Sequence, residues 1–195
     1  ITLQALELGA FDFIQKPDLS KGYSIESIKE QLITKILLAV ECKQQNRRLV
    51  EKHQVADIPK TARKTDKLKT VIIGSSTGGP QALKEVVPHL PKDLPAQFLI
   101  VQHMPPKFTD LLAQRLDGLS QINVREAKEG DTLEKNLALL APGNYHMCVE
   151  DRGTIRLNQE PPLWGVRPAI DLTLSSAAKI YKQDLICVIL TGMGH

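Results

Sequence analysis

The spacing of apolar residues divides the chain into parts with different structures. Between residues 25 and 40, apolar side chains recur every three or four positions, which predicts an amphipathic helix: they are Ile25, Ile28, Leu32, Ile36 and Val40. From residue 41 to 69 this period is lost among Lys, Gln, Asn and Thr. We therefore predict that residues 41–69 are a linker that begins as a fraying helix.

The residues before this helix look like the end of an α/β unit. A short helix closes at Gly9, because glycine is favoured just beyond a helix C-terminus. The apolar residues at 11–14 predict a short strand, which the proline at position 17 interrupts. Residues 1–40 are accordingly predicted to be one structural remnant.

Residues 70–195 alternate between continuous apolar runs and helical patterns. Strands are predicted at 70–73, 97–101, 137–141, 145–150, 154–157 and 185–190, and helices at 80–87, 108–116 and 168–181. Continuous apolar strands separated by helices are typical of a mainly parallel sheet that is covered on both faces. The predicted fold class is α/β, with a mainly parallel doubly wound sheet.

Composition excludes several classes of protein. The 195 residues are 42% hydrophobic, and no apolar stretch reaches the roughly 20 residues that a membrane-spanning helix needs. The formal net charge is +3, but residues 42–69 alone carry nine basic and three acidic residues, while 70–195 carry twelve and thirteen. The basic excess thus lies in the predicted linker, and with one Trp, three Tyr and four Phe in the chain we predict no nucleic-acid binding and no membrane insertion.

The three cysteines and the two ends of the chain indicate the setting of the protein. The cysteines, at positions 42, 148 and 187, match no metal-binding spacing, and we interpret them as buried, reduced thiols of a cytoplasmic protein. The chain begins with Ile1 rather than Met and stops at His195, directly after an apolar run. We expect both ends to be internal to a longer protein.

The first candidate site is the glycine-rich segment 74–80, which joins a strand to a helix. Open α/β folds bind their ligands at this edge of the sheet. The segment is compatible with a phosphate cradle at a helix N-terminus, with a serine nucleophile on a tight turn, or with a turn in which serine caps the helix. It lacks the Lys-Ser/Thr ending of a Walker loop and the spacing of a dinucleotide fingerprint.

Two further strand ends point to the same edge. His103 directly follows the second predicted strand, and residues 191–195 follow the last one. Because neighbouring parallel strands lie about 5 Å apart, His103 is placed to serve as general base for Ser76.

Five ordered motifs then resemble the methylesterase domain of CheB-type chemotaxis proteins. They are Ser75-Ser76-Thr77-Gly78-Gly79, Gln102-His103-Met104, Ala141-Pro142-Gly143-Asn144-Tyr145-His146, Arg167-Pro168-Ala169-Ile170-Asp171 and Thr191-Gly192-Met193-Gly194. Residues 9–17 similarly resemble the end of a response-regulator receiver domain. The resemblance implies a receiver remnant at 1–40, a linker at 41–69 and a methylesterase catalytic domain, incomplete at its C-terminus, at 70–195.

The resemblance also implies roles for individual residues. Ser76 matches the family's nucleophile, His103 its general base, and Met193 a donor to the oxyanion through its backbone N–H. Thr77 is a further site-forming residue, with turn stabilisation as the alternative. The triad aspartate is expected just after His195. In the receiver part, Lys16 matches the lysine that contacts the phosphoryl group.

Five further residues lie in or near these motifs. A structural role is favoured for Asp171 at a helix start, and His146 has no motif that makes it catalytic. Trp164 and Gly165 either line the site or pack in the interior. His195 matches a variable position of the family.

The function implied is that of a serine hydrolase. It removes methyl esters from glutamyl side chains of methyl-accepting chemoreceptors and deamidates glutamines there, without metal or organic cofactor. A sensor histidine kinase would control it through the full-length receiver, in the cytoplasm. The alternatives are an esterase domain of another signalling pathway and a catalytically degenerate regulatory or binding module.

Overall fold

The computed structural model describes residues 2–16, 25–49 and 67–192. The chain forms two compact units, one made of residues 1–9 and 65–195 and the other of residues 10–64. Each unit is described by itself. In the described residues, no helix combines the length and the apolar character needed to cross a membrane.

The smaller unit contains one long helix, α2 (Ile25–Leu49). It continues nine residues beyond the predicted end at residue 40. The predicted strand at 11–14 is wrong, because residues 10–16 form neither helix nor strand. The backbone of Phe13 makes side-chain bonds instead of ladder bonds: its N–H donates to Asp12 Oδ1 (2.7 Å) and its carbonyl accepts from Lys35 Nζ (2.8 Å). Without a partner strand among the described residues, an apolar run of this length cannot form a sheet.

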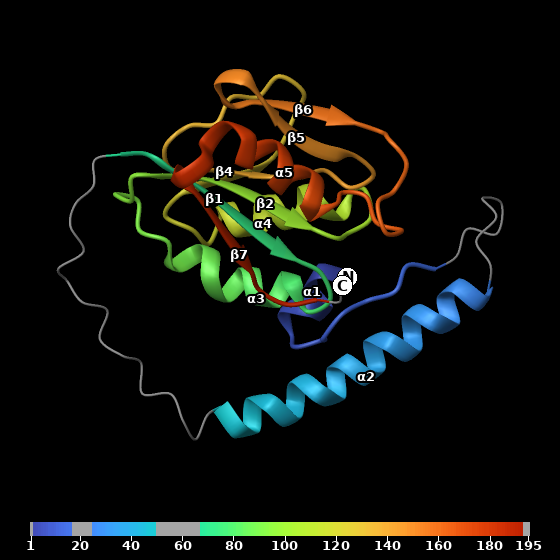
Figure 1. The fold of residues 1–195 in the computed structure, drawn as a ribbon. Coiled ribbons are helices and arrows are strands. Elements are labelled where there is room, and N and C mark those ends of the chain that lie inside the picture. Colours follow the sequence, from blue (N-terminus) through green and yellow to red (C-terminus); the bar gives the residue numbers. More distant parts are fainter. Residues whose placement is uncertain (1, 17–24, 50–66, 193–195) are drawn as a thin grey trace. The chain divides into compact units, whose positions relative to one another are not determined.

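The larger unit carries the remaining elements (Figure 1). Its α-helices are α1 (Thr2–Glu7), α3 (Gly79–Val86), α4 (Phe108–Asp117) and α5 (Ile170–Tyr181), and its strands are β1 (Lys69–Ser75), β2 (Ala96–Gln102), β3 (Asn123–Glu126), β4 (Leu137–Leu140), β5 (His146–Glu150), β6 (Thr154–Asn158) and β7 (Leu185–Ile189). Short 3₁₀ turns occupy 87–89, 151–153 and 182–184. The predicted strands and helices of this unit are confirmed, and β3 is an additional strand.

The five-stranded sheet has the order β3-β4-β2-β1-β7, and all of its pairings are parallel. Helices α3 and α4 contact each other and pack beneath the sheet, while α5 and the antiparallel hairpin β5–β6 cover its other face (Figure 1). The predicted fold class is confirmed. The chain leaves β1 toward β2 on one side and returns as β7 on the other, so the carboxyl end of β1 lies between two neighbouring strand ends, where such folds place their sites.

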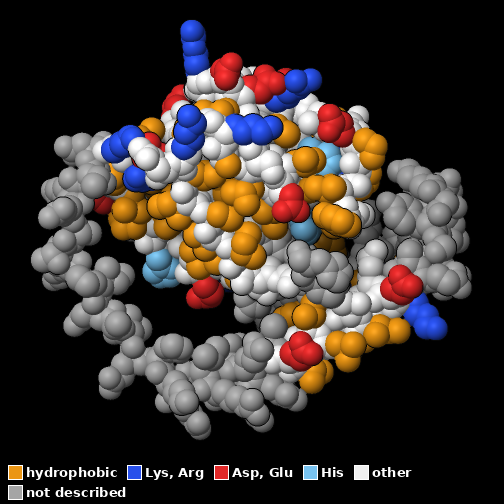
Figure 2. Space-filling view, in the orientation of Figure 1, with side chains coloured by type: hydrophobic (Ala, Val, Ile, Leu, Met, Phe, Trp, Pro, Cys, Tyr) orange, Lys and Arg blue, Asp and Glu red, His pale blue; other side chains and the backbone are white. Residues whose placement is uncertain are grey.

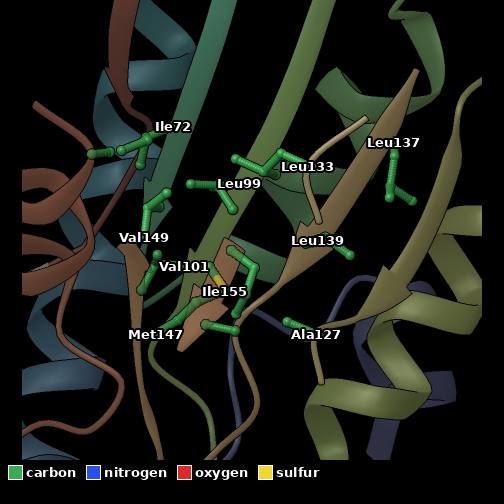
Figure 3. Packing of buried hydrophobic residues seen from close by; sticks show 12 residues of the cluster. Ile72, Leu99, Val101, Ala127, Leu133, Leu137, Leu139, Met147, Val149 and Ile155 are labelled. Atoms are coloured by element: carbon green, nitrogen blue, oxygen red, sulfur yellow. The ribbon is translucent and has the colours of Figure 1, made fainter. Parts of the chain in front are cut away.

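The main core lies between the sheet and the layer formed by α5 and the hairpin. Ile72 and Leu99 from the sheet pack with Met147 and Ile155 from the hairpin, and all four are almost fully buried (Figure 3). Because successive side chains of a strand point to opposite faces, residues two positions beyond Ile72 and Leu99 also point toward α5. Ser76 and His103 lie four positions beyond Ile72 and Leu99, so their side chains also point to the face that α5 covers.

Strand β7 is the exception to burial. Its outer side chains are exposed, with Ile189 61% accessible, and apolar side chains gather on this face in Figure 2. The expectation that Cys187 is buried is wrong, since its thiol is exposed on this strand. Strand β7 pairs only with β1, and none of the described residues covers its outer side.

Helix α1 packs against α3 and α4. Its buried Leu6 lines a small pocket together with Pro80 and Lys84 of α3 and Leu112 and Leu116 of α4. Gly9 ends this region with a positive φ of 102°, as the predicted helix stop requires.

Candidate functional site

The register between β1 and β2 brings Ser76 beside His103. The two strands pair in parallel, with Ser75 opposite Gln102 as the last matched residues. The next residue of each strand, Ser76 and His103, therefore points to the other face of the sheet, toward α5. His103 Nδ1 lies 3.2 Å from Ser76 Oγ, which confirms the predicted proximity of the two side chains.

The neighbouring serine is placed differently. Ser75 is 1% exposed, and its hydroxyl donates to Gln102 Oε1 at 2.7 Å. A hydroxyl that is buried and engaged in this way cannot approach a substrate carbonyl. Of the two serines, Ser76 thus faces His103 and Ser75 is part of the interior.

Gln102 connects the backbone at Ser76 with the backbone at His103. Besides accepting from Ser75, its side-chain amide donates to the carbonyl oxygens of Ser76 (2.8 Å) and His103 (3.0 Å). The side chain is 2% exposed. The role of Gln102 was not predicted, because its only sequence signal is a polar residue at the end of an apolar strand.

Close packing at Gly79 keeps this amide in place. A Cβ at Gly79 would lie 1.9 Å from Gln102 Oε1, so no larger residue fits without moving the amide. The first turn of α3 can therefore approach the Gln102 amide closely only because position 79 is a glycine.

The segment that follows β7 holds Ser76 from the other side. The Ser76 N–H donates to the Thr191 carbonyl (2.7 Å), and the Thr191 hydroxyl donates to the Thr77 carbonyl (3.2 Å). Gly192 follows with φ 151°, and a Cβ there would lie 2.4 Å from the Ser76 Cβ. Only glycine permits this close approach to the serine.

Two further predicted positions, Thr77 and Lys16, lie within the described residues. Thr77 is buried directly after Ser76. Lys16 is exposed and belongs to the smaller unit. Met193, Gly194 and His195 lie outside the described residues, so the predicted oxyanion donor stays a prediction.

The electrostatic environment favours neutral His103. Burial lowers the pKa of this imidazole below its ordinary value of 6.5, and the negative charge of Asp171, in the first turn of α5, opposes that shift. The second ring nitrogen, Nε2, is buried and makes no hydrogen bond to the residues that the structure describes. A neutral ring whose Nδ1 accepts the serine proton carries its own proton on Nε2.

The remaining candidates have structural surroundings or lie at the surface. His146 is fully buried and lies within hydrogen-bond distance of the Pro161 carbonyl through Nε2 and of the Ala169 N–H through Nδ1, each at 3.2 Å. Trp164 is exposed, which rules out the predicted alternative of packing in the interior.

A cavity of about 760 Å³ lies elsewhere, between the β5–β6 hairpin and α5. Its lining includes Cys148, Glu150, Arg156 and Lys179, but neither Ser76 nor His103. Burial raises the pKa of the Cys148 thiol, so this sulfur is not an activated nucleophile at neutral pH. This cavity is therefore not the site that contains Ser76 and His103. Among the residues that the structure describes, no group of three or more His, Cys, Asp or Glu side chains could hold a metal ion.

Known proteins similar to this chain identify its family. Residues 71–195 match the family described as CheB methylesterase. Relatives named protein-glutamate methylesterase/protein-glutamine glutaminase include one from Symbiobacterium thermophilum, which is 45% identical over 100% of this chain and 57% of its own length, and one from Thermotoga maritima, which is 42% identical over 100% and 56%. The chain spans about half the length of the curated relatives it matches.

A solved structure shares the fold at high sequence identity. It is the crystal structure of the Thermotoga maritima CheB methylesterase catalytic domain, with 47% identity and a TM-score of 0.62 over 65% of this chain and 68% of that domain. The motifs that carry Ser76 and His103 fall within the matched residues 71–195. The chain belongs to the CheB methylesterase family.

Proposed function

We propose that this chain carries the nucleophile and the general base of a protein-glutamate methylesterase that also deamidates glutamine. The observation that supports this most directly is the 3.2 Å contact between His103 Nδ1 and Ser76 Oγ at the carboxyl edge of the sheet. The names of the relatives supply the substrate class, an esterified glutamyl or a glutaminyl side chain of a protein.

The reaction proceeds through an acyl-enzyme. Ser76 Oγ attacks the γ-carbonyl carbon while His103 accepts the hydroxyl proton. The carbonyl π-electrons move to oxygen, and backbone N–H groups stabilise that oxyanion; Met193 is the donor that we propose, with Thr77 shaping the turn beside it. The C–O bond then breaks, the proton passes from His103 to the leaving methoxide, and methanol departs. Water, deprotonated by His103, then attacks the acyl carbon, the bond to Ser76 Oγ breaks, and His103 returns the proton to that oxygen as the glutamate leaves. For a glutaminyl substrate, the group that leaves in the first step is ammonia.

The position of the third triad member follows from the imidazole. Since Nδ1 faces the nucleophile, the Nε2–H needs an acceptor, and a carboxylate there would fix the tautomer and stabilise the protonated ring. The aspartate that the family resemblance places just after His195 is our candidate. Asp171 raises the pKa of the imidazole only through its charge.

Regulation and partners are proposed on the same basis. The substrates are methyl-accepting chemoreceptors, and the protein acts in the cytoplasm. A sensor histidine kinase phosphorylates the full-length receiver, of which residues 1–40 are the C-terminal part and in which Lys16 contacts the phosphoryl group; residues 41–69 link it to the catalytic domain at 70–195. The packing of α1 on α3 and α4 supports such control, because these two helices begin directly after the turns that hold Ser76 and His103.

The test uses the complete gene product with methylated receptor as substrate and measures methanol release. We expect Ser76→Ala and His103→Gln to lower kcat by at least about 10³-fold, and Ser75→Ala to leave most of it. Ammonia release from a receptor with glutamine at the same sites should fall in parallel. An active Ser76→Ala enzyme, or no methanol release by the unaltered protein, would exclude this function.

A further inference from the structure

Trp164, the one tryptophan of the chain, lies at the tip of a short hairpin between β6 and α5. Leu163 and Val166 exchange two backbone hydrogen bonds (3.2 and 3.1 Å). Trp164 and Gly165 are the two central residues of this turn, with φ angles of 53° and 79°. The indole is 83% exposed.

Folding gives no reason for a tryptophan at this position. A two-residue turn with both φ angles positive favours Asn or Asp followed by Gly, because a bulky side chain is strained in the left-handed region. Exposure also means that the indole gains little from burial. An unfavourable backbone and an exposed aromatic ring at one residue point to a role outside the stability of the chain.

The hairpin that presents the indole is firmly anchored. The Arg167 guanidinium donates to the carbonyl oxygens of Gln159 and Glu160 (both 2.8 Å) and to Asn144 Oδ1 (2.6 Å). The buried His146 holds both sides of the hairpin through the Pro161 carbonyl and the Ala169 N–H. The ring is therefore displayed on an ordered support, which lowers the entropic cost of binding.

The same anchors connect the hairpin to the reactive site. The Asn144 N–H donates to the Arg167 carbonyl (3.2 Å), and the adjacent Gly143 packs against the turn after His103, where a Cβ would lie 2.5 Å from the Pro106 nitrogen. Beyond the hairpin in the chain, Asp171 lies in the first turn of α5, and its charge raises the pKa of His103. The hairpin thus belongs to the rim of the site, together with the exposed Pro161 and Pro162.

We propose that Trp164 is a docking residue for the protein substrate. When a glutamyl side chain reaches Ser76, the substrate backbone has to run over the rim, and the indole then packs on an apolar side chain of the same substrate segment. Aromatic residues are favoured for this task because they offer a large contact area and have few rotatable bonds. This inference rests on the proposed function and adds to it the residue that selects a protein over a small ester.

The experiment uses Trp164→Asn, which creates the Asn-Gly pair that the turn prefers. In the complete gene product, we expect KM for methylated receptor to rise at least about tenfold with kcat little changed. Hydrolysis of p-nitrophenyl acetate should stay at the unaltered level, and the midpoint of thermal unfolding should be equal or higher. A docking residue is indicated if the variant binds the receptor more weakly but is at least as stable as the unaltered protein. A structural residue would lower both receptor binding and stability.

Leu119→Asn is the matched control, because it also replaces an exposed apolar side chain (40% accessible). Leu119 lies between α4 and the start of β3, at the amino ends of the strands and away from Ser76. We expect it to leave KM for the receptor unchanged. An unchanged KM in Trp164→Asn, an equal rise in Leu119→Asn, or a parallel loss of p-nitrophenyl acetate hydrolysis would each overturn the docking role. If the unaltered protein cleaves the small ester but not the receptor ester, the proposed function fails instead.

Discussion

Replacing Gln102 by methionine tests whether the nucleophile and the base are held by one buried amide. Methionine keeps nearly the same length and volume but removes all three of the hydrogen bonds that the amide makes to Ser75, Ser76 and His103. The Ser76 carbonyl still accepts from the Gly79 N–H (2.9 Å). The Ser75 hydroxyl, in contrast, loses its acceptor in a position that is 1% exposed.

The expected loss of stability follows from these contacts. Each hydrogen bond contributes about 1 kcal/mol net, and a buried hydroxyl without a partner costs about 1–3 kcal/mol. The free energy of unfolding should therefore fall by about 2–4 kcal/mol. Since domains of this kind are stable by about 5–15 kcal/mol, the variant should still fold.

The expected loss of activity is larger than the stability change suggests. The amide fixes the two carbonyl groups whose residues carry the reacting side chains, and a misplacement of about 1 Å lowers the rate by about 10²-fold. We expect kcat for methylated receptor to fall by about this factor, with KM within about twofold. Ser75→Ala removes only one of the bonds but leaves the buried Gln102 Oε1 without its donor, so it should cost about 1–3 kcal/mol and lower kcat by less than about threefold.

Steady-state kinetics and urea unfolding of the complete gene product measure both quantities. A Gln102→Met enzyme with nearly unaltered kcat but a lower unfolding free energy would show that the amide stabilises the fold without positioning the reacting groups. Equal losses of kcat in Gln102→Met and Ser75→Ala would show that only the serine bond matters.

Two further predictions concern the same site. Asp171→Asn removes the charge that raises the His103 pKa, so the acid limb of the kcat/KM profile should move to lower pH. High salt should move the acid limb of the unaltered enzyme in the same direction, because salt screens that charge. An acid limb that moves to higher pH would contradict this reasoning. Gly79→Ala places a Cβ 1.9 Å from Gln102 Oε1 and should lower both the unfolding free energy and kcat by displacing the amide. Gly118→Ala is the control, because its Cβ has only ordinary contacts from 3.6 Å, and it should leave kcat unchanged. Equal effects in the two variants would show that the Gln102 amide does not position the reacting groups.

Most of the catalytic domain's fold could be predicted from the sequence because its central strands are continuous apolar runs. Strand β3 was missed for the opposite reason, since only Val124 of its four residues is buried and the alternation is too short to stand out. The error at 11–14 has a related cause: an apolar run predicts a strand only if another strand pairs with it, and pairing partners are not visible in a local pattern.

The site was partly predictable from topology. That Ser76 and His103 meet follows from their places at the ends of neighbouring parallel strands. Which of two adjacent serines faces the base depends on the register of β1 against β2, because a shift of one residue exchanges the two faces. The sequence alone left that choice to the family resemblance, and the pairing of Ser75 with Gln102 now gives it a physical basis. The exposure of Trp164 had no sequence signal at all.

The two tasks of the site are supported by different kinds of contact, and this has a consequence for how such an enzyme can change. Main-chain bonds from the sheet hold the reacting residues: the His103 N–H donates to the Ser75 carbonyl (3.1 Å) and the Ser76 N–H to the Thr191 carbonyl (2.7 Å). These main-chain bonds do not depend on side-chain identity, so substitutions that spare Gln102 and the glycines at 79 and 192 can leave the reacting geometry intact. The Trp164 hairpin is instead anchored through the side chains of Arg167 and His146. Its tip can therefore vary while the anchors persist, so that substrate preference changes without disturbing the chemistry at Ser76.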